Sequence, residues 1–323
     1  MNNGRPWLLA QVSCLVLGVV ACGSSRGSAS NDVAPGADNR ASTQDAGPPA
    51  GYVRYTSSTI KVPANTSSQW FEWVAPPADH DVDIVDIEGW QSKGGHHALL
   101  YATTDIQPVG TVKPWDNQEI LQGHILGGVG GEAGVTIKLP AGAVYRLHAG
   151  QALALQTHYL NAGVDAIEAS SRLDVKVGEP STSDVVASTF GNSSLTFSVP
   201  AQSKYQLQLK CTIATDVSFL MFTNHMHQWG TSATTVLTDA TGAQHVLKDD
   251  PVWNAEWITD PNYAMFTVAA PRALHAGDVL TTTCSWSNTT DSALVFPEEM
   301  CAFAGAFIGD KDVSCLDGSW QTL

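Results

Sequence analysis

The chain has 323 residues and a formal net charge of −15 at pH 7, because 31 aspartates and glutamates outnumber 16 lysines and arginines. Such an acidic surface repels phosphate backbones, so the composition argues against nucleic acid as a partner and favours small neutral or cationic molecules. The length is more than one hydrophobic core usually holds, which predicts two domains.

The first 21 residues predict an export signal. Arg5 precedes an apolar segment, Leu8 to Ala21, that is too short to span a membrane. The tetrad Val19-Val20-Ala21-Cys22 resembles a bacterial lipoprotein signal, which would leave Cys22 acylated as the new N-terminus. We therefore expect an exported lipoprotein of the cell envelope, in the periplasm, at the outer membrane or at the cell surface, held to a membrane through Cys22. A plain secretory cleavage nearby is the alternative.

Residues 22–50 are predicted to form a flexible linker, because they are rich in Ser, Ala, Gly, Asp and Pro and poor in large apolar side chains. A second composition change falls in "VGEPSTSD", Val177 to Asp184, where Gly, Pro and Ser interrupt two strand-like runs. The sequence thus predicts a signal peptide at 1–21, a linker at 22–50, an N-terminal domain at 51–178 and a C-terminal domain at 179–323.

Strand signals dominate both predicted domains. The run "KYQLQLKCTI" places Tyr205, Leu207, Leu209, Cys211 and Ile213 on one face. Several other short runs alternate or are rich in β-branched residues, and "TDATGAQHVL" predicts a hairpin around residues 240–242. No stretch has a long helical period. These patterns predict an all-β fold of two antiparallel, jelly-roll-like β-sandwiches in tandem.

Cysteine usage agrees with export. Beyond the signal region the chain holds only Cys211, Cys284, Cys301 and Cys315, all in the second half. A zinc site is the competing use, but no C-x-x-C spacing is present, so two disulfides are favoured. Four cysteines allow three pairings, and their spacing does not choose among them.

The pattern His225-Met226-His227 has the spacing of residues on one face of a strand, with Met226 pointing to the opposite layer. Two imidazoles placed in this way form a ready chelate for a metal ion. A second candidate is His158, which should share a face with Gln156.

His96 and His97 are adjacent, so a regular strand would point them to opposite faces. They can bind one metal only if the strand ends or bulges there, which the preceding Gly94-Gly95 permits. A lone histidine is more often a core or surface residue than a ligand. The remaining histidines have no such partners and are assigned to loops and surface: His80, His124, His148, His245 and His275.

Four separated fragments, taken together, favour a metal-binding role for these histidines over a core or surface role. In chain order they are "HHALLYAT", "LQTHY", "HMHQWG" and "EEMC", and they span nearly the whole globular part. In this order they resemble the copper type II, ascorbate-dependent monooxygenases, the family of the peptidylglycine alpha-hydroxylating and dopamine beta-monooxygenases.

The resemblance implies two coppers per chain in separate sites. His96, His97 and His158 would hold the first copper, with Nδ1 of His96 as one ligand. The second copper would be held by His225, His227 and Met300. Imidazole suits both oxidation states of copper, and a thioether favours Cu(I), so the donor types agree with the implied metal.

The resemblance also implies the disulfides Cys211–Cys315 and Cys284–Cys301, the second of which would fix the loop that carries Met300. The family's disulfides in the first domain have no counterpart here, so that domain must depend on packing, and its copper site is expected to be looser.

The implied activity is hydroxylation of a substrate C–H bond with O2 and an external one-electron reductant such as ascorbate. His225, His227 and Met300 would lie at the reacting copper, a solvated cleft would separate the two metals, and Gln156 would help to couple them. A non-catalytic copper-binding or copper-buffering lipoprotein and an adhesion sandwich are the alternatives.

Departures from the family's pattern bear mainly on the substrate. Ala98, Met226 and Ser218 replace residues that are not inferred ligands. In contrast, Thr223, Ala302 and Ala304 stand where peptide-amidating members carry the Arg, Asn and Tyr that hold a peptide carboxylate. Their loss argues against peptidylglycine and leaves a small organic molecule of unknown identity as the expected substrate.

Overall fold

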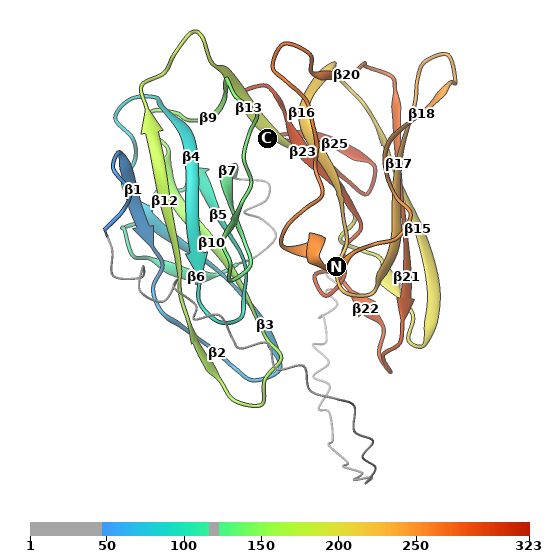
Figure 1. Ribbon diagram of the computed structural model, residues 1–323, viewed down its shortest axis with the longest axis horizontal. Helices are drawn as coiled ribbons and strands as arrows, with labels where there is room; N and C mark the ends of the chain where they lie inside the picture. The colour runs from blue at the N-terminus through green and yellow to red at the C-terminus, as the bar shows by residue number, and fades with distance from the viewer. Residues whose placement is uncertain (1–46, 116–122) are drawn as a thin grey trace, which may run out of the picture. The chain divides into compact units, whose positions relative to one another are not determined.

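In the computed structural model, residues 47–115 and 123–323 are described, and they form strands joined by loops (Figure 1). The predicted signal peptide, Cys22 and most of the predicted linker lie outside the described residues. The described part contains no α-helix and only a short 3-10 helix, η2 (Ala255–Ile258), so none of its helices is long and apolar enough to cross a membrane. The prediction of an all-β fold is confirmed.

The first half of the described chain forms two facing sheets. One has the order β1-β12-β4-β9, and the other has the order β6-β3-β10-β5-β7-β8. A small pair, β2 and β11, lies beside them. The strands are β1 (Tyr52–Thr56), β2 (Ile60–Val62), β3 (Thr66–Ala75), β4 (Val82–Gln91), β5 (Gly95–Thr103), β6 (Val112–Pro114), β7 (Gly123–Gly130), β8 (Val135–Thr136), β9 (Ala143–Leu147), β10 (Ala152–Asn161), β11 (Ile167–Ala169) and β12 (Ser171–Gly178).

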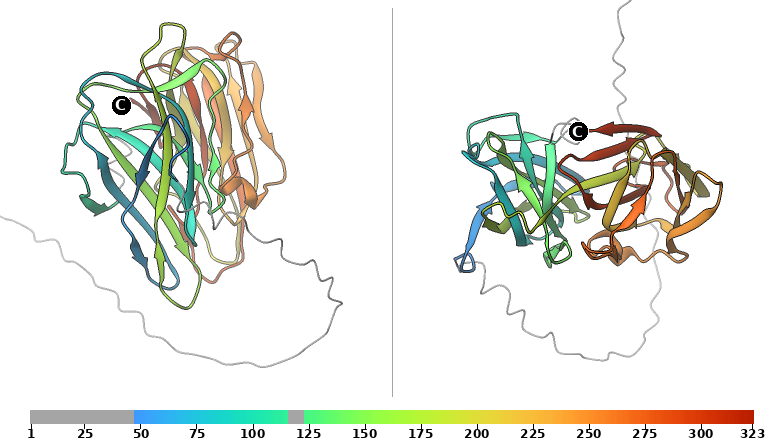
Figure 2. Two further views of the ribbon diagram at one scale, coloured as in Figure 1. Left: turned by 60° about the vertical axis from the view of Figure 1, so that its left-hand side comes forward. Right: turned by 90° about the horizontal axis from the view of Figure 1, so that it is seen from above.

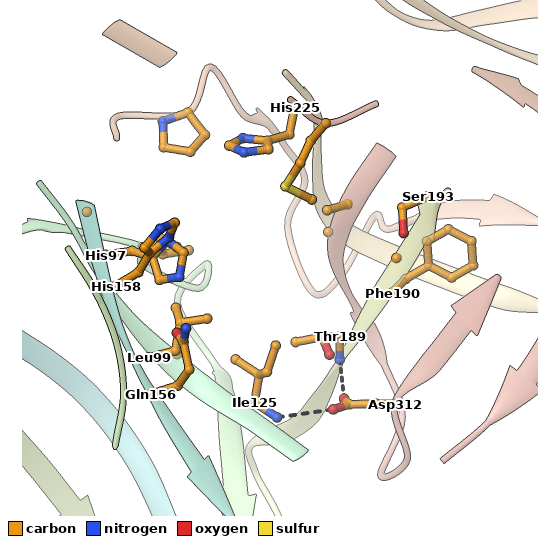
Figure 3. A pocket seen from close by; sticks show the side chains of 18 of the residues that line it. His97, Leu99, Ile125, Gln156, His158, Thr189, Phe190, Ser193, His225 and Asp312 are labelled. Carbon is orange, nitrogen blue, oxygen red and sulfur yellow. Dashed lines mark hydrogen bonds between the residues drawn. The ribbon is translucent and has the colours of Figure 1, made fainter. Parts of the chain in front are cut away.

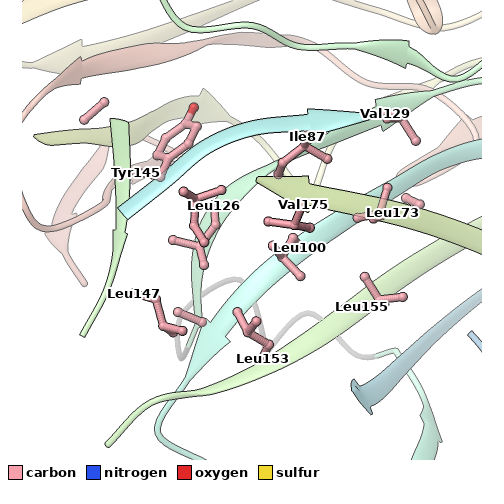
Figure 4. Packing of buried hydrophobic residues seen from close by; sticks show 14 of the residues in the cluster. Ile87, Leu100, Leu126, Val129, Tyr145, Leu147, Leu153, Leu155, Leu173 and Val175 are labelled. Carbon is pink, nitrogen blue, oxygen red and sulfur yellow. The ribbon is translucent and has the colours of Figure 1, made fainter. Parts of the chain in front are cut away.

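A hydrophobic core fills the space between these two sheets (Figure 4). Leu100 of β5 and Leu155 of β10 enter it from one sheet, and Leu173 and Val175 of β12 enter it from the other. Because side chains alternate along a strand, the neighbours of Leu100 and Leu155 point to the opposite face. That outer face of β5 and β10 carries the histidines discussed below.

The second half forms a sandwich of its own. Its four-stranded sheet has the order β15-β21-β17-β18, and its other sheet contains β13, β23, β16 and β19 together with β20, β24 and β25. The strands are β13 (Val185–Ser193), β14 (Ser198–Val199), β15 (Ser203–Thr212), β16 (Val217–His225), β17 (Gly230–Thr238), β18 (Gln244–Asp250), β19 (Ala264–Met265), β20 (Arg272–Leu274), β21 (Val279–Asn288), β22 (Leu294–Val295), β23 (Ala302–Ile308), β24 (Val313–Leu316) and β25 (Ser319–Thr322).

Aromatic rings dominate this second core. Phe190, Phe219, Phe222 and Phe303 lie in mutual contact, with ring centroids 5.0 to 6.2 Å apart. The predicted alternation in β15 and the predicted hairpin between β17 and β18 are both present. Each half therefore has the interior that its own period-two pattern requires.

The two sandwiches are joined through one continuous sheet. Strands β9 and β13 pair in parallel over two positions, Val185 with Ala143 and Val186 with Val144. The views in Figure 2 show the first-half strands, blue to green, beside the second-half strands, yellow to red. Residues 47–323 form one compact unit, so the surface where the two sandwiches meet belongs to that unit.

Candidate metal centre

A bulge in β5 brings the adjacent residues His96 and His97 to one site. His158 of β10 pairs with His97, but the next residue, Tyr159, pairs with Gly95, so His96 is one residue more than the regular ladder holds. An extra residue of this kind lets neighbouring side chains share a face. Both rings line the same cavity, and their centroids are 4.9 Å apart. Of the two possibilities that the sequence left open, a strand end and a bulge, the structure has the bulge.

Two glycines make this backbone possible. Gly94 has a φ of +83°, a conformation that other residues rarely adopt, and a Cβ added to it would lie 2.9 Å from the carbonyl oxygen of Leu160. A Cβ added to Gly95 would lie 2.3 Å from Cβ of Gln91. Larger residues at either position would force the turn before His96 apart.

His158 completes a triangle of imidazoles with His96 and His97. Its ring centroid lies 4.8 Å from that of His96 and 5.0 Å from that of His97, and one ligand nitrogen from each ring lies within 4.8 Å of the other two. Two nitrogens bound to one ion at typical metal–nitrogen distances are at most about 4.2 Å apart. Small side-chain rotations would therefore let all three bind one metal, and the donor set fits.

Polar neighbours hold this triangle from outside. The Ser67 hydroxyl lies 2.8 Å from Nε2 of His158, which leaves Nδ1 of that ring for a ligand. Gln156 lines the cavity on the same face as His158, as predicted, and its amide nitrogen donates to Oε1 of Gln69 at 3.0 Å. Oε1 of Gln156 is buried without a hydrogen bond of ordinary geometry among the described residues, although the Gln156 side chain interacts with the His97 ring.

The second group of predicted ligands lies at the end of β16. This strand ends at His225, and His227 follows in a turn, so the expected strand over both residues is only partly correct. Both rings still line one cavity with Met300, and Met226 between them is fully buried on the other side. The ring centroids of His225 and His227 are 5.2 Å apart. Nδ1 of His227 lies 3.1 Å from the Glu298 carbonyl oxygen, to which it can donate, and this arrangement leaves Nε2 for a metal.

Glu299, which the sequence reasoning did not single out, organises this turn. Its carboxylate is fully buried and accepts four N–H groups: the backbone N–H groups of His227 at 3.0 Å, Trp229 at 2.7 Å and Met300 at 3.3 Å, and the indole N–H of Trp286 at 2.8 Å. A buried charge is stable only when it is bonded in this way. Glu299 therefore ties the segment that carries His227 to the segment that carries Met300.

Both disulfides implied by the resemblance are present. Cys284 pairs with Cys301, the residue directly after Met300, and Cys211 pairs with Cys315. The segment that carries Met300 is therefore fixed on one side by a covalent bond and on the other by Glu299.

The two ligand groups lie next to each other, contrary to the expectation of a solvated cleft between them. The ring centroids of His96 and His227 are 5.5 Å apart, and the rings meet edge to face at 87°. The five imidazoles thus form one continuous cluster at the surface between the sandwiches. Figure 3 shows His97 and His158 on one side of the cavity and His225 on the other.

Burial keeps these imidazoles neutral, which is the form that binds metals. It lowers the pKa of His96 to about 3, and it holds the pKa values of His97, His158 and His225 well below their usual range. The pKa of His227 is also lowered by burial, although the Glu299 carboxylate acts in the opposite direction.

Of the histidines assigned to loops and surface, His124 is misassigned. It is the second residue of β7, its side chain is only 14% exposed, and its Nδ1 lies 2.7 Å from Oδ1 of Asp312 in the second sandwich. His80, His245 and His275 are exposed, as expected. This contact could not be predicted from local sequence, because Asp312 is far from His124 along the chain.

A cavity of about 390 Å³ opens beside the histidines. Ala304, one of the three positions compared with the peptide-binding residues of the family, lines it. Thr223 and Ala302 are buried and are not among the lining residues. Of the three positions where the family's peptide-binding side chains are absent, only Ala304 therefore affects the lining of this cavity.

Comparison with known proteins does not extend this picture. No protein-family model and no curated protein matches the chain. Among solved structures, PNGase F, a glycosylasparaginase from Flavobacterium meningosepticum, is 12% identical with a TM-score of 0.37, covering 81% of this chain and 97% of that one. The major capsid protein P2 of bacteriophage PM2 is 8% identical with a TM-score of 0.30, covering 79% and 97%. TM-scores this low carry no inference about function, and neither protein is a copper monooxygenase.

Proposed function

We propose that the chain is a copper-dependent monooxygenase that hydroxylates a C–H bond of a small organic substrate. The proposal rests on one observation: five neutral imidazoles and a thioether-bearing residue, drawn from four separate segments, line one cavity. Burial lowers the pKa values of all five rings, and titratable groups perturbed in this way in one cavity are typical of a functional site.

The donor types favour copper. The cluster offers imidazoles and Met300, and no carboxylate or thiolate is among the proposed ligands. An all-histidine set such as His96, His97 and His158 suits zinc as well as copper. The preference for copper therefore rests on the resemblance to the copper monooxygenases and on Met300, whose thioether selects Cu(I). His96, His97 and His158 would bind one copper, and His225, His227 and Met300 would bind the other.

Bound copper would supply one-electron redox chemistry and activation of O2. The overall reaction would be R–H + O2 + two electrons + two protons → R–OH + H2O, with the electrons from an external donor such as ascorbate. The protein's residues would hold the ligands rigid through Ser67 and Glu299, and the cavity walls would orient the substrate and exclude water.

We also propose that the protein works outside the cytoplasm. Two disulfides support an oxidising compartment, and the N-terminal sequence supports export with a lipid at Cys22. A membrane anchor would then hold the catalytic unit at the cell envelope.

An anaerobic Cu(I) titration of the full chain against a chromogenic chelator tests the metal assignment. We expect two coppers per chain, one copper in His97→Ala and in His225→Ala, and two in the control His245→Ala, whose ring is exposed and bonded to Asp239. Failure to bind copper would leave the histidines without this role and would favour the adhesion sandwich.

Oxygen uptake by the copper-loaded protein with ascorbate then separates the enzyme from a copper buffer. Substrate-dependent uptake with one oxygen atom of ¹⁸O2 in the product is the expected result. Tight binding of two coppers without turnover, across a broad panel of C–H substrates, would favour the copper-buffering lipoprotein.

A further inference from the structure

The cavity extends well beyond the histidines along β5. His97, Leu99 and Tyr101 alternate on the cavity side of this strand, while Ala98 and Leu100 enter the core. At about 3.3 Å per residue, Tyr101 lies roughly 13 Å from His97 along the strand. Tyr101 pairs with Ile125 of β7, and in Figure 3 Ile125 lies away from His225. The space can therefore hold an elongated molecule with one end at the histidines.

The walls of this space are largely apolar. Among the described lining residues, no Lys or Arg is present, and Asp312 is the only carboxylate side chain. Asp312 is fully engaged: it accepts the backbone N–H groups of Ile125 at 3.1 Å and Thr189 at 2.6 Å, and it contacts the His124 ring. The described walls thus offer no cation to a negatively charged ligand, and their one carboxylate side chain is already engaged.

Two phenol hydroxyls are available at the Asp312 end. Tyr145 and Tyr263 both line the cavity, and neither hydroxyl has a hydrogen-bond partner among the described residues. The Tyr145 ring lies 6.3 Å from the His124 ring, which places it beside Asp312. Burial raises the pKa of both phenols, so they remain neutral donors.

Small residues keep the opposite wall open. Gly191 of β13 lines the cavity, and a Cβ added there would meet no atom within 4 Å. Its partner across the strands is Ala304, which also lines the cavity. Any side chain at position 191 would project into the space that a ligand needs.

We propose that this cavity binds an uncharged, mainly apolar molecule with a hydrogen-bonding oxygen at one end, which Tyr145 and Tyr263 contact, and with its other end at the histidine cluster. That this molecule is the hydroxylation substrate rests on the proposed function. Binding of the molecule to the metal-free protein does not rest on the proposed function, so the cavity proposal and the proposed function can fail separately.

Three probes of one shape test the proposal: naphthalene, 2-naphthol and 2-naphthoate, titrated into the metal-free full chain and followed by probe fluorescence. We expect 2-naphthol to bind about 3- to 10-fold more tightly than naphthalene, the contribution of one hydrogen bond. We expect 2-naphthoate to bind at least 10-fold more weakly than 2-naphthol, because the lining residues that the structure describes include no Lys or Arg. Equal or tighter binding of 2-naphthoate would overturn the proposal.

Two variants locate the binding. Gly191→Leu should weaken 2-naphthol binding more than 10-fold, and the double variant Tyr145→Phe, Tyr263→Phe should make 2-naphthol and naphthalene bind equally. Both variants should still bind two coppers. Unchanged 2-naphthol affinity in either variant would show that the probe binds elsewhere and would reject the site. If instead the unsubstituted protein binds the probe but no copper, and the variants lose probe binding, the cavity proposal stands and only the proposed function is rejected.

Discussion

The two ligand groups reach the same cavity by different structural means. His96, His97 and His158 are placed by a β-ladder and one bulge, in a sandwich whose described residues contain no disulfide. His227 and Met300 lie in loops that are fixed by a disulfide and a buried carboxylate. A sheet positions ligands through its register, whereas a loop needs specific bonds to hold the same geometry. The second group should therefore depend strongly on a few bonded residues, and the first group mainly on its glycines, with a smaller contribution from Ser67.

The largest effects should come from the disulfides, and they should separate stability from metal binding. Cys211–Cys315 spans 104 residues and Cys284–Cys301 spans 17, so their removal should cost about 4.7 and about 3 kcal/mol of unfolding free energy. We expect the paired Cys→Ser variant of the short-loop bond, the less destabilised of the two, to lose the second copper. Denaturant unfolding and copper titration measure both quantities. If the variant that lacks Cys211–Cys315 loses more copper than the variant that lacks Cys284–Cys301, copper binding simply follows stability, and the short-loop disulfide has no separate role at the second site.

Glu299→Gln comes next. An amide NH2 cannot accept the N–H groups that the carboxylate oxygen accepted, so we expect a loss of about 3 kcal/mol of unfolding free energy and of copper at the His225 group, with the His96 group still loaded. Glu298→Gln is the matched control, because this neighbour is exposed. If Glu299→Gln binds two coppers with unchanged affinity, the Glu299 carboxylate is not needed to position His227 and Met300.

Acid should destabilise the metal-free protein through the same histidines. Their folded-state pKa values lie below the unfolded value of 6.5, so protons bind preferentially to the unfolded chain. Stability should be unaffected above about pH 6.5 and should fall as the pH falls, by about 1.4 kcal/mol per pH unit for each histidine, with His96 contributing down to about pH 3. Denaturant unfolding from pH 7.5 to 5 measures the slope. A flat profile would contradict the burial of these rings.

The smallest effect concerns the first group. Ser67→Ala removes the hydroxyl beside Nε2 of His158 and should weaken copper at this group by about 10-fold, without changing the second. Ser68→Ala is the control on the neighbouring residue. If Ser67→Ala weakens copper binding no more than Ser68→Ala does, the hydrogen-bonded strand β10 alone orients the His158 ring.

Much of the fold could be predicted from the sequence, because strand periodicity is local. The alternation in β15 and the turn before β18 follow from neighbouring residues, whereas Gly94 and Gly95 only permit a break at His96 and do not say whether the strand ends or bulges there. The end of β16 at His225 could not be predicted in this way. Glu299, 72 residues away, takes the N–H of His227, and no local pattern records that bond.

The spacing of the two ligand groups was equally beyond local reasoning. The expected cleft came from the family resemblance, whereas the contact of His96 with His227 depends on how two sandwiches meet. That meeting involves backbone fits such as Gly130 against Thr259, where an added Cβ would lie 2.0 Å from a carbonyl oxygen. Packing of this kind is set by many residues at once.

The short seam between β9 and β13 gives this arrangement a mechanical property. Each set of donors belongs to its own sandwich, and β9 and β13 continue the sheet from one to the other over two paired positions. A slight hinge rotation at that seam would widen or narrow the gap from His96 to His227 while leaving the geometry of either set intact. If both proposed coppers bind, the distance between them would therefore depend on how the two sandwiches are held together and not on the ligands of either site.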